Sequence, residues 1–270
     1  MKKNQTDRLT IQHLKSKGVE GIFGKVAKSH DISVNKVSQI VFDILKNSYK
    51  SLTFRYREKI GKKEINEKLN EIDKRLGITL FVVNSSIKPD GGIIEVKDKD
   101  NNWRIVLVAE AKHQGKDIEN IKMGILVGKN KDQDLMVAGN AIERSHKNIN
   151  EIRNIMLGEK HFPYILFLQG SNFLTKPITV VRPDGRAVEL RHNVGSLNRI
   201  DRLTAANFSM PINENSCENI FITTSSGEKV MLQAVSIFTK ATPWTAEEMI
   251  PIMIDVAETS LRVLGLNNDS

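Results

Sequence analysis

The sequence has very little cysteine: Cys217 is the one cysteine among 270 residues. A single cysteine excludes an intrachain disulfide framework and a cysteine-based zinc or iron–sulfur cluster, and it fits a reducing cytoplasm. The longest apolar stretches, Ile105–Ala109 and Tyr164–Leu168, are far too short to span a bilayer. No apolar run follows the first lysines, so we expect no signal peptide. These absences predict a cytoplasmic protein without a membrane segment.

Several other features are missing. The chain contains no internal repeat, no low-complexity tract and no linker rich in Pro, Gly or Ser. It contains neither the Gly-x-Ser-x-Gly motif of serine hydrolases nor a phosphate-binding Gly-x4-Gly-Lys-Ser/Thr loop. Its six histidines are scattered without zinc-ligand spacing. With 40% hydrophobic and 27% charged residues, the chain is typical of a globular protein, and we expect residues 1–270 to form one domain.

Positive charge is in excess and is unevenly distributed. The formal net charge is +8. Residues 1–30 carry seven lysines and arginines against two acids, whereas residues 240–270 carry two against five. The basic N-terminal end is consistent with an arm that faces phosphates, but a basic N-terminus that only aids solubility fits equally well.

The apolar spacing predicts an α/β domain around a mixed sheet. Helical periodicity covers 33–49 and 64–76. Segments rich in Val and Ile then predict strands, followed by two helices and a strand buried on both faces. The strands are expected at 79–84, 91–97, 103–112 and 163–169, and the later helices at 117–126 and 140–157.

The segment from Ile87 to Lys112 carries a chemical pattern. Two strands flank the polar loop at 98–102, which predicts a hairpin. If the turn is centred on Asp100, Asp90 lies opposite Glu110, and Lys112 points to the same face. The spacing therefore predicts two carboxylates and an ammonium group at one edge of the sheet.

Two neighbouring carboxylates repel unless a cation or a proton lies between them. Oxygen ligands favour Mg²⁺, which keeps several waters and takes one or two carboxylates together with phosphate oxygens. A metal there would support hydrolysis of a phosphodiester, with Lys112 orienting water or neutralising charge on the phosphate. The alternative is a structural salt bridge between Lys112 and Glu110 or Asp90, and the residues alone leave both interpretations open.

A second segment matches the edges of DNA bases. Asn140 is a good helix N-cap, and Glu143 three residues later resembles a capping box. Asn140, Glu143 and Arg144 at a helix N-terminus have the donors and acceptors that base edges require. From the residues alone, a helix cap with a solvated face is the favoured interpretation. Arg199 and Arg202 similarly fit either guanine recognition or an ordinary charged helix face.

Taken together, these motifs resemble the EcoRI family of type II restriction endonucleases, within the nuclease superfamily marked by Pro-Asp…Asp/Glu-x-Lys. The resemblance extends from about Arg8 to about Gly265. Its densest stretches are NSSIKPDGG (84–92), VAEAKHQGKDI (108–118), AGNAIERSHKNI (138–149), QGSNFLT (169–175) and LNRIDRLTAAN (197–207). Blocks of this length are far more specific than the short catalytic motif.

The resemblance implies a restriction-endonuclease-like fold, with residues 1–20 as a flexible arm that wraps DNA. It implies that Asp90, Glu110 and Lys112 are catalytic, and that Asp90, Glu110 and the carbonyl of Ala111 bind Mg²⁺, with Mn²⁺ as a substitute. The implied DNA-backbone contacts are Asn84, Ser85, Ser86, Lys88, Lys147 and Asn148. The implied base-recognition residues are Gln114, Met136, Val137, Ala138, Gly139, Asn140, Ala141, Glu143, Arg144, Arg199 and Arg202.

The family's activity is cleavage of the palindrome GAATTC between G and A, which leaves 5′-phosphate AATT overhangs. The resemblance further implies a homodimer on double-stranded DNA and a methyltransferase that protects host DNA without a stable complex. Val137 and Ser196 depart from the family's pattern beside base-reading elements, which puts recognition of the outer base pairs in question. The alternatives are a structure-specific nuclease of the same superfamily and a DNA-binding protein that does not cleave.

Overall fold

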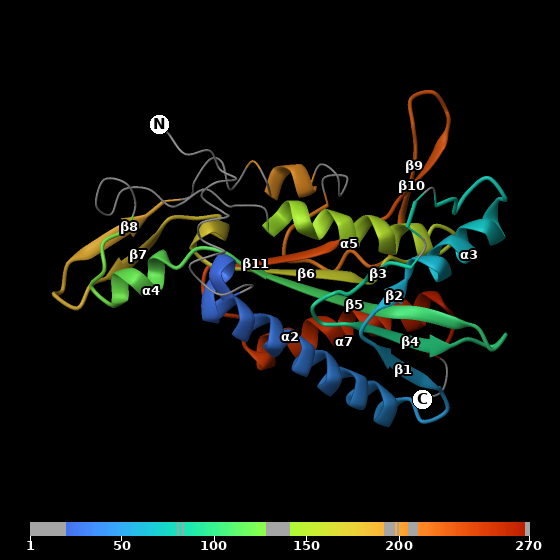
Figure 1. Cartoon of the computed structure of the whole chain (residues 1–270), viewed down its shortest axis with the longest axis horizontal. Coiled ribbons are helices and arrows are strands. Elements are labelled where there is room, and N and C mark those ends of the chain that lie inside the picture. Colours follow the sequence, from blue (N-terminus) through green and yellow to red (C-terminus); the bar gives the residue numbers. More distant parts are fainter. Residues whose placement is uncertain are drawn as a thin grey trace.

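The computed structural model describes residues 20–79, 81–82, 84–127, 141–191, 198, 200–204 and 210–267, with the backbone alone at 20–33, 141, 143 and 144. A mixed sheet of five strands forms the centre of the molecule (Figure 1). Its order is β1 (Phe54–Arg57), β4 (Ile93–Lys97), β5 (Trp103–His113), β6 (Tyr164–Gln169) and β11 (Ser236–Lys240). Strand β4 runs antiparallel to its neighbours β1 and β5, whereas β5, β6 and β11 are parallel. This arrangement confirms the predicted α/β fold with a mixed sheet.

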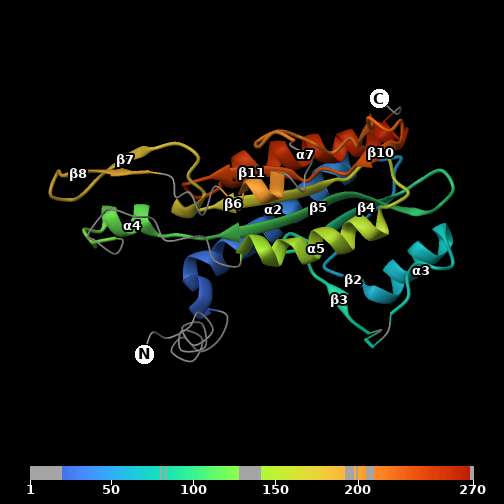
Figure 2. The same ribbon diagram turned by 90° about the horizontal axis from the view of Figure 1, so that it is seen from above.

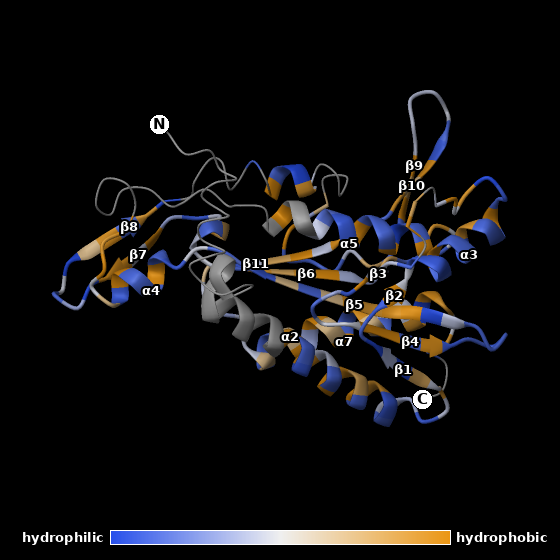
Figure 3. Ribbon diagram, in the orientation of Figure 1, coloured by the Kyte–Doolittle hydropathy of each residue, from blue (hydrophilic) through white to orange (hydrophobic). Residues whose placement is uncertain are grey.

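Helices cover both faces of this sheet (Figure 2). One face packs against α2 (Glu20–Ser48) and α7 (Ala246–Val263), and the other against α3 (Lys62–Ile72) and α5 (Ala141–Ile155). Every residue of β6 is buried, as expected of a parallel strand with both faces covered. Hydropathy colouring shows the apolar residues concentrated on these central strands (Figure 3).

Side chains alternate between the two faces along the central strands. On β6, Ile165 and Phe167 belong to the apolar cluster under α2 and α7, whereas Leu166 and Leu168 belong to the cluster under α5. This alternation follows from strand geometry and fixes which face a polar residue on these strands can reach.

The predicted hairpin of β4 and β5 forms, but its register changes part of the way along. Lys97 pairs with Trp103 as expected, whereas Ile93 pairs with Val108 rather than with Leu107. A bulge between Ile94 and Glu95 shifts the register by one residue, because β5 contributes one residue that has no partner on β4. The expectation that Asp90 lies directly opposite Glu110 is therefore wrong.

Other boundaries differ from those expected. The helix predicted at 33–49 is the second half of α2, because Ile22, Phe23 and Val26 already follow the same apolar spacing. The prediction of a strand at 79–84 is wrong for the residues that are described. They lie outside every sheet, and Phe81 among them is 93% exposed. The helices predicted at 117–126 and 140–157 correspond to α4 (Asp117–Lys122) and α5.

Smaller elements project from the central body (Figure 1). At one end, α4 packs against the β-hairpin of β7 (Ile178–Val181) and β8 (Ala187–Leu190) through a separate apolar cluster. At the other end, β9 (Ile220–Thr223) and β10 (Lys229–Leu232) form a second hairpin. The short pair of β2 (Ile60–Gly61) and β3 (Ser86–Ile87) lies near α3.

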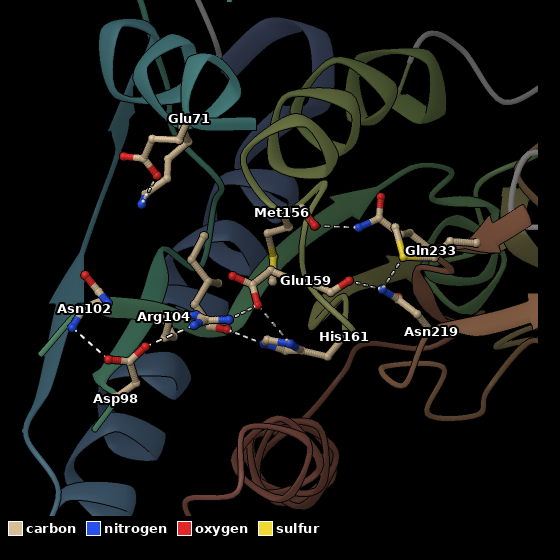
Figure 4. Close-up of polar contacts among 12 residues, drawn as sticks. Glu71, Asp98, Asn102, Arg104, Met156, Glu159, His161, Asn219 and Gln233 are labelled. Atoms are coloured by element: carbon tan, nitrogen blue, oxygen red, sulfur yellow. Dashed lines mark hydrogen bonds and ion pairs between the residues drawn. The ribbon is translucent and has the colours of Figure 1, made fainter. Parts of the chain in front are cut away.

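A partly buried polar network ties the start of β5 to the chain that leads into β6 (Figure 4). Arg104 donates to Asp98 at 3.0 Å and also to Glu159. His161 is fully buried, and its Nε2 donates to the carbonyl of Ile105 at 2.8 Å. Burial lowers the pKa of His161, so the ring is held neutral.

Within the described ranges, none of the helices has the length and apolar character needed to cross a bilayer.

Candidate active site

Asp90 lies in a tight turn that brings it against β5. Gly91 donates its backbone N–H to the carbonyl of Ala109 at 2.8 Å. A Cβ atom at Gly91 would lie 2.7 Å from the Cβ of Ala109 and 2.9 Å from Oγ of Ser38. Gly92 has a φ of 76°, a left-handed conformation that favours glycine. The Pro-Asp-Gly-Gly sequence therefore permits an approach that side chains would prevent.

Glu110 and Lys112 lie two residues apart near the C-terminal end of β5 and point to the face covered by α5. Glu110 is fully buried, and its carboxylate contacts Asn148 of α5 and Tyr164 of β6. Residues of α5 and Tyr164 belong to the apolar cluster on that face. Because side chains two residues apart on a strand share a face, Lys112 points to the same side as Glu110.

Lys112 bridges the two carboxylates. Its Nζ forms an ion pair with Oδ2 of Asp90 and lies 2.9 Å from Oε1 of Glu110. The Lys112 side chain is 16% exposed and that of Asp90 is 22% exposed, against 1% for Glu110. The site is therefore buried at Glu110 and opens to solvent at Asp90. The three residues predicted to act together do meet, although Asp90 arrives from the turn and not from a paired strand position.

Charge neutralisation dominates the electrostatics of this cluster. Burial acts to lower the pKa of Lys112, but the negative charges of Glu110 and Asp90 outweigh it, so that pKa is raised. Lys112 therefore carries a positive charge between two carboxylates. The backbone N–H of Ala111 lies 3.4 Å from Oδ2 of Asp90 and adds a weak donor.

The two oxygens of Glu110 have different surroundings. Oε2 accepts hydrogen bonds from the hydroxyl of Tyr164 and, at 3.0 Å, from Nδ2 of Asn148. Oε1 is buried, forms the ion pair with Lys112, and accepts no hydrogen bond of good geometry from the described residues. One oxygen is thus saturated with neutral donors, and the other faces only a cation.

These residues fit a hard divalent cation. Oδ2 of Asp90 and Oε1 of Glu110 converge on one cationic nitrogen, and both are oxygen donors of the kind Mg²⁺ prefers. The described residues contain no cluster of three or more His, Cys, Asp or Glu side chains arranged around one point. Two carboxylates are nevertheless enough for Mg²⁺, because water and phosphate oxygens complete its shell.

The predicted DNA-backbone contacts lie on two neighbouring segments. Asn84, Ser85 and Ser86 are exposed on the chain that leads to Asp90. Lys88 is 63% exposed, and its Nζ lies 2.8 Å from Oε2 of Glu58. The other two residues lie on α5, where Lys147 is exposed and Asn148 contacts Glu110.

Much of the predicted base-recognition set lies outside the described residues. Residues 136–140, which include Val137, lie outside the described residues, as do Ser196 and Arg199. The predicted N-terminal arm at 1–20 also lies outside them except for Glu20, which begins α2. The backbone of Ala141, Glu143 and Arg144 forms the first turn of α5, and nothing is described of their side chains. Arg202 is exposed. Gln114 follows β5 directly, where its backbone N–H donates to the carbonyl of Gln169 at 2.8 Å.

Tyr164 is a functional candidate that the sequence analysis missed. It begins the apolar run of β6, and its ring stacks on that of Phe162 with centroids 5.9 Å apart. A signal was present, because a tyrosine in a strand buried on both faces needs a partner for its hydroxyl. The identity of that partner depends on the parallel pairing of β5 with β6, which the sequence does not specify.

Comparisons with known proteins found a family and two relatives that match nearly the whole chain. A family described as "Restriction endonuclease EcoRI" matches residues 16–269. The chain is 62% identical to the type II restriction enzyme EcoRI of Escherichia coli over 265 residues, which cover 97% of this chain and 95% of that protein. It is 53% identical to the type II restriction enzyme RsrI of Cereibacter sphaeroides over 263 residues, again covering 97% and 95%.

Proposed function

The chain belongs to the EcoRI family of restriction endonucleases, and from this premise we propose that it hydrolyses double-stranded DNA at a palindromic site with Mg²⁺ as its cofactor. The observation that carries the proposal is the position of Lys112 between the carboxylates of Asp90 and Glu110. Lys112 and Asp90 are partly open to solvent, so a phosphate group can approach them from outside the core.

Asp90, Glu110 and the backbone carbonyl of Ala111 would hold the metal, with Mn²⁺ as a substitute. When bound, the metal polarises the phosphodiester and lowers the pKa of a bound water. The buried carboxylate of Glu110 fixes one side of the site, and the turn at Asp90 supplies the other. Lys112 orients the attacking water and neutralises the charge that develops on the phosphate.

For recognition, we propose the sequence GAATTC, cut between G and A to leave 5′-phosphate AATT overhangs. This proposal rests on the family motifs around residues 136–144 and 197–207. The first of these segments includes the start of α5 at Ala141, and a helix start presents backbone N–H groups and a positive dipole end, which favours approach to phosphates. Each wrong base pair would cost ~1–3 kcal/mol, so six pairs that are read together discriminate strongly.

The proposed assembly is a cytoplasmic homodimer on double-stranded DNA. A two-fold dimer matches the symmetry of a palindrome and supplies one active site to each strand. A methyltransferase of the same specificity would protect host DNA without forming a stable complex with the nuclease. A basic N-terminal arm would add phosphate contacts, so affinity would fall as salt rises.

The test is digestion of plasmid and random-sequence DNA with Mg²⁺, followed by sequencing of the ends. Discrete fragments that end in AATT support the proposal. Cutting of branched substrates alone would indicate a structure-specific nuclease, and a gel shift without cutting would indicate a binding protein. Glu110→Gln serves as the matched variant: it should abolish cleavage and leave specific DNA binding measurable. Unchanged turnover in that variant would remove Glu110 from the mechanism.

A further inference from the structure

We propose that Tyr164 is a positioning residue for Glu110, which it holds together with Asn148 so that one carboxylate oxygen is fixed and the other is presented to the metal. The inference rests on the proposed function, since it concerns the same metal site. It assigns a role to a residue of β6 that the catalytic motif does not contain.

Tyr164 is placed rigidly. The residue is fully buried, and its ring stacks on Phe162 with an angle of 13° between the ring planes. Its backbone pairs with Val108, two residues before Glu110 on the neighbouring parallel strand. The side chains of both residues therefore leave the sheet on the α5 face, where the hydroxyl donates to Oε2 of Glu110.

The donors divide the carboxylate into two functional halves. Tyr164 and Asn148 both donate to Oε2, and Lys112 lies 2.9 Å from Oε1. A carboxylate held by two donors on one oxygen cannot rotate without breaking both hydrogen bonds. Oε1 is therefore kept on the side of Asp90, whose Oδ2 contacts the same ammonium group. Fixing a ligand through its outer hydrogen bonds is a general requirement of metal sites.

Asn148 connects this arrangement to the rest of α5. The helix begins at Ala141, near the predicted base-recognition residues, and Asn148 lies two turns further along. A shift of α5 on DNA would therefore change one of the two donors to Glu110. Tyr164 is the cleaner probe of positioning, because it is fully buried whereas Asn148 is also a predicted DNA-backbone contact.

The experiment measures Mn²⁺ binding by electron paramagnetic resonance on the full-length chain, bound to a duplex with non-hydrolysable linkages at the predicted cleavage positions. Tyr164→Phe keeps the ring and removes the hydroxyl. We expect Mn²⁺ affinity to fall by ~10–100-fold, the usual effect of losing an outer hydrogen bond to a metal ligand. Cleavage at low Mg²⁺ should fall in parallel and recover at high Mg²⁺, while the KM for DNA stays unchanged.

Two further variants separate positioning from a general structural effect. Tyr49→Phe is the control, because Tyr49 directly follows α2 and its hydroxyl lies 3.2 Å from Oε1 of Glu258 on α7. Loss of this hydroxyl should leave Mn²⁺ binding unchanged. In a Glu110→Gln background, Tyr164→Phe should cause no further loss of Mn²⁺ affinity. If Tyr164 acts through Glu110, the effects of the two substitutions do not add.

Each outcome separates this inference from the proposed function. If Glu110→Gln loses Mn²⁺ but Tyr164→Phe binds it as the parent does, the positioning role is refuted and the metal site stands. If the parent chain shows no Mn²⁺ binding that depends on Glu110, the proposed metal site itself fails. Additive losses in the double variant would show that Tyr164 acts independently of Glu110.

A second measurement needs no substitution of Tyr164 itself, in case Tyr164→Phe does not fold. The chain has three tyrosines, so incorporation of 3-fluorotyrosine gives three ¹⁹F signals. Variants at Tyr49 and Tyr56 assign two of them, and the third belongs to Tyr164. Mg²⁺ should shift the Tyr164 signal in the parent chain and not in Glu110→Gln. A signal that does not respond to Mg²⁺ would overturn the inference.

Discussion

Gly91→Ala tests whether the close approach of the Asp90 turn to β5 is needed for activity. The new Cβ would lie 2.7 Å from the Cβ of Ala109, 2.9 Å from Oγ of Ser38 and 3.0 Å from the carbonyl oxygen of Ala109. Carbon atoms pack comfortably at about 3.5–4.0 Å. The turn would have to move by about 1 Å, because the Cβ of Ala109 is fixed to the centre of a strand.

Both activity and stability should respond. A displacement of about 1 Å at a catalytic group can cost about 100-fold in rate, so we expect a loss of that order in single-turnover cleavage. Overpacking typically costs ~1–3 kcal/mol, and each kcal/mol lowers the melting temperature of a chain of this size by about 2–4 °C. Binding of specific DNA without metal should change little, since the new Cβ meets Ala109 and Ser38 and none of the predicted DNA-contact residues.

Gly158→Ala is the matched control, because a Cβ there meets nothing within 4 Å. Single-turnover cleavage and thermal unfolding should be compared for both variants and the parent chain. If Gly91→Ala cleaves within a few-fold of Gly158→Ala at saturating Mg²⁺, the tight approach of Asp90 is not required and the reasoning is wrong.

Three further predictions follow from charge and burial. Arg144→Lys should weaken discrimination between specific and random DNA more than it weakens non-specific affinity, because an ammonium group cannot donate the paired hydrogen bonds of a planar guanidinium to a base edge. Equal losses of affinity for both DNAs would indicate a phosphate contact. Glu58→Gln should raise DNA affinity a few-fold at low salt by releasing Lys88, and an unchanged affinity would argue that Lys88 does not reach a phosphate. His161 is buried and has a lowered pKa, so the unfolded chain binds its proton at a higher pH than the folded chain does. The free energy of unfolding should therefore fall as the pH drops below about 6.5, the ordinary histidine pKa, with a shallower pH slope in His161→Gln. Equal slopes in denaturant titrations of the two proteins would contradict this assignment.

The central elements of the fold could be predicted because their apolar periods are strong. The apolar run at 164–168 and the segment rich in Val and Ile at 103–112 predicted strands close to the observed β6 and β5. The last third of the chain was not predicted, although Thr245 and Glu248 form a capping box at the start of α7. That helix contains Pro251, and its packing on β5 depends on a neighbour far away in the sequence.

Register was the point at which local reasoning failed. Residue pairs counted outward from a hairpin turn are correct as far as a bulge, and beyond the bulge every pair is shifted by one residue. The extra residue lies in an uninterrupted apolar run, so nothing in the sequence marks it. Asp90 still reaches Lys112, because a turn of two glycines places it without any paired strand position.

The sequence by itself determined the catalytic candidates, because Glu110 and Lys112 share one face of a predicted strand and Asp90 lies just before the strand that pairs with it in a hairpin. Only the tertiary structure decided how Glu110 is held. Its donors Asn148 and Tyr164 are 38 and 54 residues away, on a helix and on a parallel strand. Parallel pairing and helix packing join segments that share no local pattern, so the partners of a buried carboxylate are fixed only once the sheet and its covering helix have assembled.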